Sequence, residues 1–193
     1  MRVVLFSLLL SVVLFSCGNE PKKDVPVAAK TIPATPPAAA ESALEKTGTE
    51  ELMNMLAHYY SLKDALVAGS TQKADEAASK LMSAAEIFLA EHATPSAHPE
   101  LRPGTQQIMQ NAEAITRLNP ENLDKRRELF SLISEDMFNV LKAAKLRHGG
   151  VYRDHCPMAF DEKGANWLSS DVAIKNPYLG EKMDDCGEVT DSL

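Results

Sequence analysis

Apolar side chains recur at intervals of three and four residues in four successive stretches between residues 49 and 147. This spacing places them on one face of an α-helix, whereas a half-buried strand would alternate apolar and polar positions. The stretches therefore predict four helices, whose inward faces are formed by Leu52, Met55, Leu56, Tyr59, Leu62 and Leu66; by Ala74, Ala77, Ala78, Leu81, Ala85, Phe88 and Leu89; by Ile108, Ala112 and Ile115; and by Leu123, Phe130, Ile133, Met137, Val140, Leu141 and Ala144.

Residues with capping or turn chemistry separate these helices. Thr49 precedes two acidic residues, which suit the positive end of a helix dipole. Gly69 suits the end of the first helix, Ser70 can cap the second, and Pro120 suits the first turn of the fourth. The sequence thus predicts an all-α fold, an up-down helical bundle of about four helices. After the bundle we expect an irregular C-terminal segment, residues 149–193, that contains Cys and Met residues.

The N-terminus has the features of a signal peptide. Arg2 supplies a positive charge, and residues 3–15 form an apolar run shorter than the roughly 20 residues that a membrane-spanning helix needs. The run leads into Leu14-Phe15-Ser16-Cys17, which resembles a lipobox, the motif that precedes a lipid-carrying cysteine. We therefore expect residues 1–16 to be removed and Cys17 to be lipidated, with palmitate among its acyl chains. An ordinary signal peptide with a coincidental cysteine is the alternative.

Residues 17–48 are expected to form a tether between the lipid and a folded domain. This stretch contains five prolines and few apolar residues, so it cannot bury a core of its own. Proline-rich segments favour extended, semi-rigid conformations and serve as spacers, although a partner-binding segment is the alternative. The folded domain would then comprise residues 49–193, a length typical of one domain.

The charge balance restricts the partners of the chain. The 20 Lys and Arg residues are outnumbered by 27 Asp and Glu residues, and the net charge is −7, without a basic cluster. Such a chain is a poor ligand for nucleic acid, so we expect membrane attachment through the N-terminal lipid alone. Gly18, rather than the Asp that retains lipoproteins at the inner membrane of enteric bacteria, follows Cys17. We expect a lipid-anchored, periplasm-facing protein of the cell envelope, at the outer rather than the inner membrane.

Soft sulfur ligands are concentrated in the C-terminal segment. The proline after Cys156 favours an extended backbone there, and residues i and i+2 of an extended segment point the same way, so Cys156 and Met158 can converge. Met183 and Cys186 share a face if their segment forms a helical turn. Two thiolates and two thioethers suit Cu(I). The candidate metal ligands are Cys156, Met158, Met183, Cys186 and His155.

A disulfide would explain the same cysteines. Export places a chain where disulfides form, and a Cys156–Cys186 bridge would close a loop of about 30 residues and contribute about 3–4 kcal/mol to stability. The residues alone leave metal binding and a disulfide equally open. The chain has no Gly-rich phosphate loop, HExxH motif or CxxC motif, so we expect it not to be an enzyme.

Several short motifs carry a family resemblance. They are His58-Tyr59-Tyr60-x-Leu62-Lys63-Asp64-Ala65-Leu66-Val67, Tyr152-x-x-x-Cys156-Pro157-Met158-Ala159, Gly164-Ala165-x-Trp167-Leu168-Ser169, Ile174-Lys175-Asn176-Pro177-Tyr178-x-Gly180 and Met183-x-x-Cys186-Gly187. Together they resemble a family of little-characterised periplasmic domains, found in exported lipoproteins, whose C-terminal motif is also attached to adaptor subunits of heavy-metal efflux systems. The resemblance implies association with copper or related metals.

From these observations we expect a periplasm-facing lipoprotein that binds copper, as Cu(I), or another soft heavy metal. Its role would be buffering, resistance or handover to an efflux system. Its partners would be metal-efflux or periplasmic metal-handling proteins. The alternative is a non-catalytic, partner-binding lipoprotein in which Cys156–Cys186 is a structural disulfide.

Overall fold

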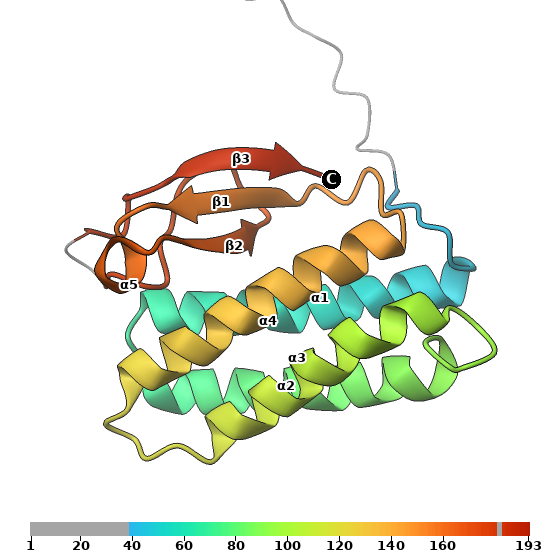
Figure 1. Ribbon diagram of the computed structural model, residues 1–193, viewed down its shortest axis with the longest axis horizontal. Helices are drawn as coiled ribbons and strands as arrows, with labels where there is room; N and C mark the ends of the chain where they lie inside the picture. Colours follow the sequence, from blue (N-terminus) through green and yellow to red (C-terminus); the bar gives the residue numbers. More distant parts are fainter. Residues whose placement is uncertain (1–38, 181–182) are drawn as a thin grey trace, which may run out of the picture. The chain divides into compact units, whose positions relative to one another are not determined.

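The computed structural model describes residues 39–180 and 183–193. Four long helices come first along this part of the chain, and a small sheet follows them (Figure 1). The elements are α1 (Lys46–Val67), α2 (Thr71–Glu91), a 3₁₀ turn η1 (Pro99–Leu101), α3 (Arg102–Thr116), α4 (Leu123–Ala143), β1 (Tyr152–Cys156), α5 (Ala159–Glu162), β2 (Ala165–Ser169) and β3 (Glu188–Ser192). The predicted signal peptide 1–16, the lipidation site Cys17 and residues 18–38 lie outside the described residues.

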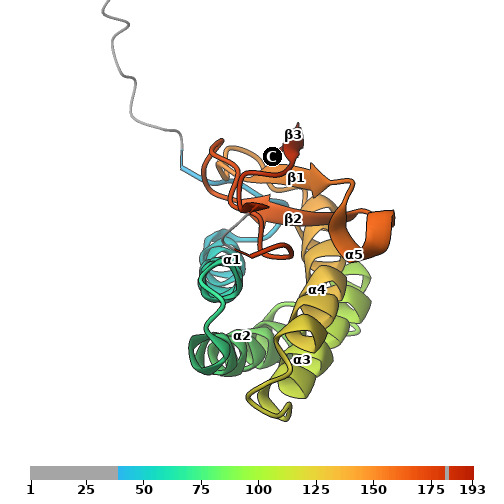
Figure 2. The ribbon, with the colours of Figure 1, turned by 90° about the vertical axis from the view of Figure 1, so that its left-hand side faces the viewer.

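The helices form two layers, with the sheet as a third. Consecutive helices pack against each other, and α1 also contacts α4. Figure 2 shows the sheet above α1 and α4, with α2 and α3 on the opposite side of the helices. The apolar faces predicted from the sequence meet between the helices, where Leu52, Leu81, Ile108 and Phe130 are fully buried. Burial of these faces is the main source of helical stability.

Local sequence signals agree with some helix ends and not with others. The helix α1 begins at Lys46 rather than at Thr49, and α4 begins at Leu123, after Pro120. The Ser70 side chain caps α2 by accepting a hydrogen bond from the amide of Lys73 at 3.4 Å. Gly69, just before it, has a φ of +64°, which glycine adopts without the strain that a side chain would cause. Pro103 stands in the first turn of α3, where no helical partner is needed for its missing amide hydrogen.

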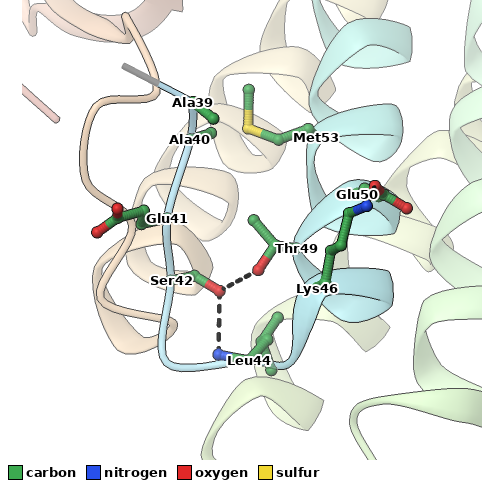
Figure 3. A pocket seen from close by; sticks show the side chains of 9 residues that line it. All are labelled: Ala39, Ala40, Glu41, Ser42, Leu44, Lys46, Thr49, Glu50 and Met53. Atoms are coloured by element: carbon green, nitrogen blue, oxygen red, sulfur yellow. Dashed lines mark hydrogen bonds and ion pairs between the residues drawn. The ribbon is translucent and has the colours of Figure 1, made fainter.

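The chain packs against the bundle before α1 begins. Glu41 pairs with Arg147 in an isolated bridge, and the amide of Ala43 donates to the carbonyl of Ala144 at 2.7 Å. The Ser42 and Thr49 hydroxyls lie 2.8 Å apart (Figure 3), and Leu44 is buried. Residues 39–48, assigned to the tether by composition, therefore pack with the domain that was expected to begin at residue 49.

The prediction of an all-α fold is wrong. The segment expected to be irregular contains a three-stranded antiparallel sheet with the strand order β2-β1-β3. Tyr152 pairs with Ser169 and Cys156 pairs with Ala165 between β1 and β2. On the other side of β1, His155 pairs with Glu188 of β3. The protein is therefore a helical bundle with a sheet packed on one side.

The strands were missed because their inward positions are not uniformly apolar. On β1 the buried positions are Asp154 and Cys156, so a charged group occupies one of them. All five residues of β3 are exposed, so this edge strand has no buried face to mark it. Pairing along the backbone, rather than a run of apolar side chains, defines this sheet.

A buried tyrosine joins the sheet to the helices. The Tyr59 hydroxyl, on α1, lies 2.8 Å from the hydroxyl of Ser134 on α4. It also accepts a hydrogen bond from the amide of Leu168 on β2, at 2.9 Å. From β1, the Arg153 guanidinium donates to both carboxylate oxygens of Glu135 on α4. These contacts fix the sheet over α1 and α4 and so position the residues at its ends.

Candidate thiol site

The pairing of β1 with β3 brings the two cysteines together. Because these strands are antiparallel and His155 pairs with Glu188, the residue after His155 lies near the residues just before Glu188. Cys156 ends β1, and Cys186 precedes β3 by two residues. Their Sγ atoms are 2.9 Å apart.

The two thiols are free, and they differ in access to solvent. Cys156 is fully buried, whereas Cys186 is half-buried. A disulfide has an S–S bond of about 2.05 Å, and two sulfurs bound to one tetrahedral metal at about 2.3 Å lie about 3.8 Å apart. The observed separation falls between these values, so a movement of about 1 Å would give either arrangement.

Gly187 allows β3 to approach the site closely. Its φ is +141°, and a Cβ atom at this position would lie 2.8 Å from the Trp167 ring and 2.9 Å from the carbonyl oxygen of His155. Any side chain would therefore push the start of β3 away from β1. Since Cys186 is the preceding residue, this glycine sets the distance between the two thiols.

Asn176, in the Asn-Pro-Tyr motif, holds the backbone of the second cysteine. Its side chain is fully buried. The amide group donates to the carbonyl of Cys186 at 2.7 Å, and its oxygen accepts from the amide of Tyr178 at 2.7 Å. Arg127 on α4 donates to the carbonyl of Pro177 at 2.9 Å, which ties this loop to the bundle. The motif thus positions Cys186 rather than providing a ligand.

Three aromatic rings pack together in the same C-terminal region as the thiol pair. The Tyr178 ring lies 5.8 Å from Trp167 and 5.2 Å from Phe160, measured between centroids. Phe160 belongs to α5, where Phe160 and Asp161 have left-handed backbone angles with φ of 54° and 58°. This short left-handed turn follows directly from Cys156-Pro157-Met158. Side chains in such a conformation are strained, and strain of this kind is concentrated at functional sites.

The Cys186 thiol holds its proton more tightly than an isolated cysteine does. The hydrogen bond with Cys156, followed by burial and by the charges nearby, raises the pKa of the Cys186 thiol to about 11. Burial also raises the pKa of Tyr178 above its ordinary value. A metal that binds here would have to displace thiol protons.

The two methionines are near the cysteines in sequence but remain exposed. Met158 is 50% exposed and Met183 is 37% exposed. The expected turn is present at Met183, because the amide of Cys186 donates to its carbonyl at 3.2 Å. Cys156 is extended as expected, but β1 ends there and the chain turns at Pro157. Met158 therefore lies in the turn, where its side chain is exposed rather than buried beside Cys156.

His155 is placed away from the thiols. Neighbouring residues on a strand point to opposite faces of the sheet, so His155 and the buried Cys156 diverge. His155 Nδ1 lies 2.9 Å from Asn166 Oδ1, and the Asn166 amide donates to Glu135 at 2.7 Å. The side chain therefore belongs to a hydrogen-bonded row that leads to Glu135 on α4.

Asp154 is a buried group that sequence reasoning did not single out. It is fully buried, and neither carboxylate oxygen has a hydrogen-bond partner among the described residues. Desolvation raises the pKa of Asp154 to about 6, and the nearby Lys63 opposes this rise. Since the fold favours the protonated form, the contribution of Asp154 to stability falls as the pH rises through that value. The alternation of β1 was the one signal that could have placed this residue inward.

The helical part of the domain matches a known family model. Residues 55–149 fit the model described as protein of unknown function (DUF3347). Over these residues the chain is similar to the DUF3347 family. No curated protein and no solved structure matches the chain. The DUF3347 match ends before β1, so both cysteines of the sheet lie beyond it.

Within the described residues, none of the helices combines the length and the apolar character needed to cross a membrane. The longest, α1, has 22 residues and contains Lys46, Glu50, Lys63 and Asp64.

Proposed function

We propose that the protein is a non-catalytic metal-binding lipoprotein whose thiol pair, Cys156 and Cys186, takes one Cu(I) ion or another soft heavy metal. The observation that carries the proposal is the 2.9 Å separation of two free thiols that are 30 residues apart in sequence. Charged, soft thiolates are ligands that Cu(I) prefers over hard donors.

The surroundings of the pair support binding rather than a permanently closed site. Cys186 is half-buried, so a metal donor can reach its sulfur from solvent, while Cys156 is buried. Met158 and Met183 are exposed beside the two cysteines in sequence and could deliver a soft metal or complete its coordination. The resemblance to domains attached to heavy-metal efflux adaptors supports a role in buffering, resistance or handover.

A Cys156–Cys186 disulfide is the second candidate, and the same short distance favours it. In that case the bridge would fasten the start of β3 to the end of β1, and the domain would serve to bind a partner protein. The two functions differ in the redox state that they need, because a disulfide sulfur is a poor metal ligand.

Titration of the full chain with Cu(I) distinguishes metal binding from a structural disulfide. With the thiols reduced and oxygen excluded, we expect one Cu(I) per chain in competition with a chromophoric Cu(I) chelator. The fluorescence of Trp167, the only tryptophan, should change with occupancy because Gly187 lies against its ring. Oxidising the pair beforehand is the control and should abolish binding. A reduced chain that leaves all Cu(I) on the chelator would contradict the proposal.

We also propose that the domain is held at the periplasmic side of the cell envelope by lipid on Cys17, with outer-membrane placement. The support is the apolar run that ends at Ser16-Cys17, together with the proline-rich stretch before the folded domain. A lipid anchor and a spacer would hold the thiol site at a distance from the membrane, where metal-handling proteins could reach it.

Replacing Cys17 with Ser should abolish labelling with a radioactive fatty acid and move the protein from the membrane to the soluble fraction. The reason is that a single cysteine carries the proposed anchor. Cys186→Ser is a matched control, since it removes a thiol but should leave fractionation unchanged. Persistence of the Cys17→Ser variant in washed membranes would show that another feature anchors the chain.

A further inference from the structure

Three side chains able to bind a metal converge where the start of α1 lies beside the end of α2. Glu51 comes from the first turns of α1, Glu91 is the last residue of α2, and His92 follows it. One donor atom from each lies within 4.8 Å of the other two. Figure 1 shows that α1 begins at the opposite end of the domain from α5 and the end of β1. The cluster is therefore separate from the thiol site.

His92 has an unpaired nitrogen that points into this cluster. Its side chain is 9% exposed, and Nε2 has no hydrogen-bond partner among the described residues. The same is true of Glu51 Oε2, although the two atoms are 3.3 Å apart. That separation allows an ion pair, but the geometry is not that of a hydrogen bond. Because buried polar atoms are rarely left unpaired, both atoms indicate a missing partner.

The residues around His92 hold its ring in place. Gly48, in the first turn of α1, leaves room for it, because a Cβ atom there would lie 3.1 Å from His92 Nδ1. On the other side, the Phe88 ring centroid is 5.6 Å from that of His92. A fixed imidazole binds a metal better than a mobile one, because less freedom is lost on binding.

A small cavity gives access to the cluster. Its volume is about 160 Å³, and Leu44, Glu45, Glu91, His92, Ala97 and His98 line it. The space is sufficient for water molecules, which complete the coordination of a metal that has three protein ligands.

We propose that Glu51, Glu91 and His92 form a second metal site, for a divalent transition-metal ion such as Zn(II). One imidazole nitrogen and two carboxylate oxygens are the ligand types that Zn(II) takes in sites that keep a position open for water. This ligand set is harder than the thiol pair and does not suit Cu(I). A bound ion would join the start of α1 to the end of α2 and satisfy the unpaired atoms of both Glu51 and His92.

The test is calorimetric titration with Zn(II) of a full chain in which Cys17, Cys156 and Cys186 are replaced by Ser. We expect one Zn(II) per chain and a rise in the thermal midpoint that a chelator reverses. Glu51→Gln, Glu91→Gln and His92→Gln should each weaken binding by about tenfold or more, the scale found for even indirect metal contacts. Because Glu91 is exposed, its substitution should leave folding unchanged.

Glu86→Gln is the matched control, since it removes an exposed carboxylate from the same helix and should leave the affinity unchanged. If the thiol-free chain fails to fold, the same titration is run on the wild-type chain with its two sulfurs oxidised to a disulfide. Absence of Zn(II) binding in a folded chain would show that Glu51 and His92 form an ion pair only. Equal affinity in the parent and the Glu91→Gln variant would place the metal elsewhere.

Discussion

Replacing both Cys156 and Cys186 with Ser should weaken Cu(I) binding by more than about a hundredfold, because the substitution removes both charged soft ligands. Single substitutions should each lose most of this affinity, since the remaining thiolate would act with neutral donors alone. The measurement is competition with a Cu(I) chelator, after circular dichroism has confirmed that each variant is folded. Of the two single variants, Cys186→Ser should disturb folding less, because the Cys186 side chain is half-buried whereas that of Cys156 is fully buried.

The methionines provide the matched comparison. Met158→Leu and Met183→Leu preserve side-chain volume and remove only the thioether sulfur. We expect each to reduce Cu(I) affinity by less than about tenfold, because thioethers are neutral and both side chains are exposed. Parent-like affinity in the double serine variant would show that the thiol pair is not the site. A larger loss from the methionine variants than from the cysteine variants would assign the site to the thioethers.

The helices could be predicted because their spacing is periodic and their caps are local. Ser70 and Gly69 act on the residues next to them, so the sequence contains the necessary information. The sheet could not be predicted in this way, because β3 is exposed along its whole length and β1 buries the carboxyl group of Asp154. Its strands are specified by partners distant in sequence, which a local pattern does not record.

The same distinction applies to the site. The cysteines were singled out by their chemistry, and the structure brings them together. The directions of Met158 and His155 depended on where β1 ends. The chain turns at Pro157, and His155 lies on the opposite face of β1 from Cys156, where it contacts Asn166. The Glu51–Glu91–His92 cluster was missed because its members come from two helices. A helical hairpin does place the start of its first helix beside the end of its second, and that rule could have found it.

The Asn-Pro-Tyr motif was noticed for its resemblance, but its physical role emerged only with the fold. Asn176 is buried and bonds to the backbone on both sides of the loop, at Cys186 and at Tyr178. It connects the recognisable motif to the thiol pair without touching either sulfur. The loop in turn is fastened to α4 through Arg127 and Pro177. The family motifs around the thiols are thus divided between side chains that could bind metal and side chains that position them.

Replacing Asn176 with Ala should destabilise the domain by about 2–6 kcal/mol, because it leaves the carbonyl of Cys186 and the amide of Tyr178 without a partner, at about 1–3 kcal/mol each. With Cys186 no longer held, we also expect Cu(I) affinity to fall by about tenfold, although both thiols remain. Thermal unfolding and chelator competition at a temperature where the variant is folded measure the two effects. Lys175→Ala, which removes an exposed ion pair with Asp184, is the neighbouring control and should change stability by less than about 1 kcal/mol. Unchanged Cu(I) affinity in the folded Asn176→Ala variant would show that the loop stabilises the domain without positioning the thiol.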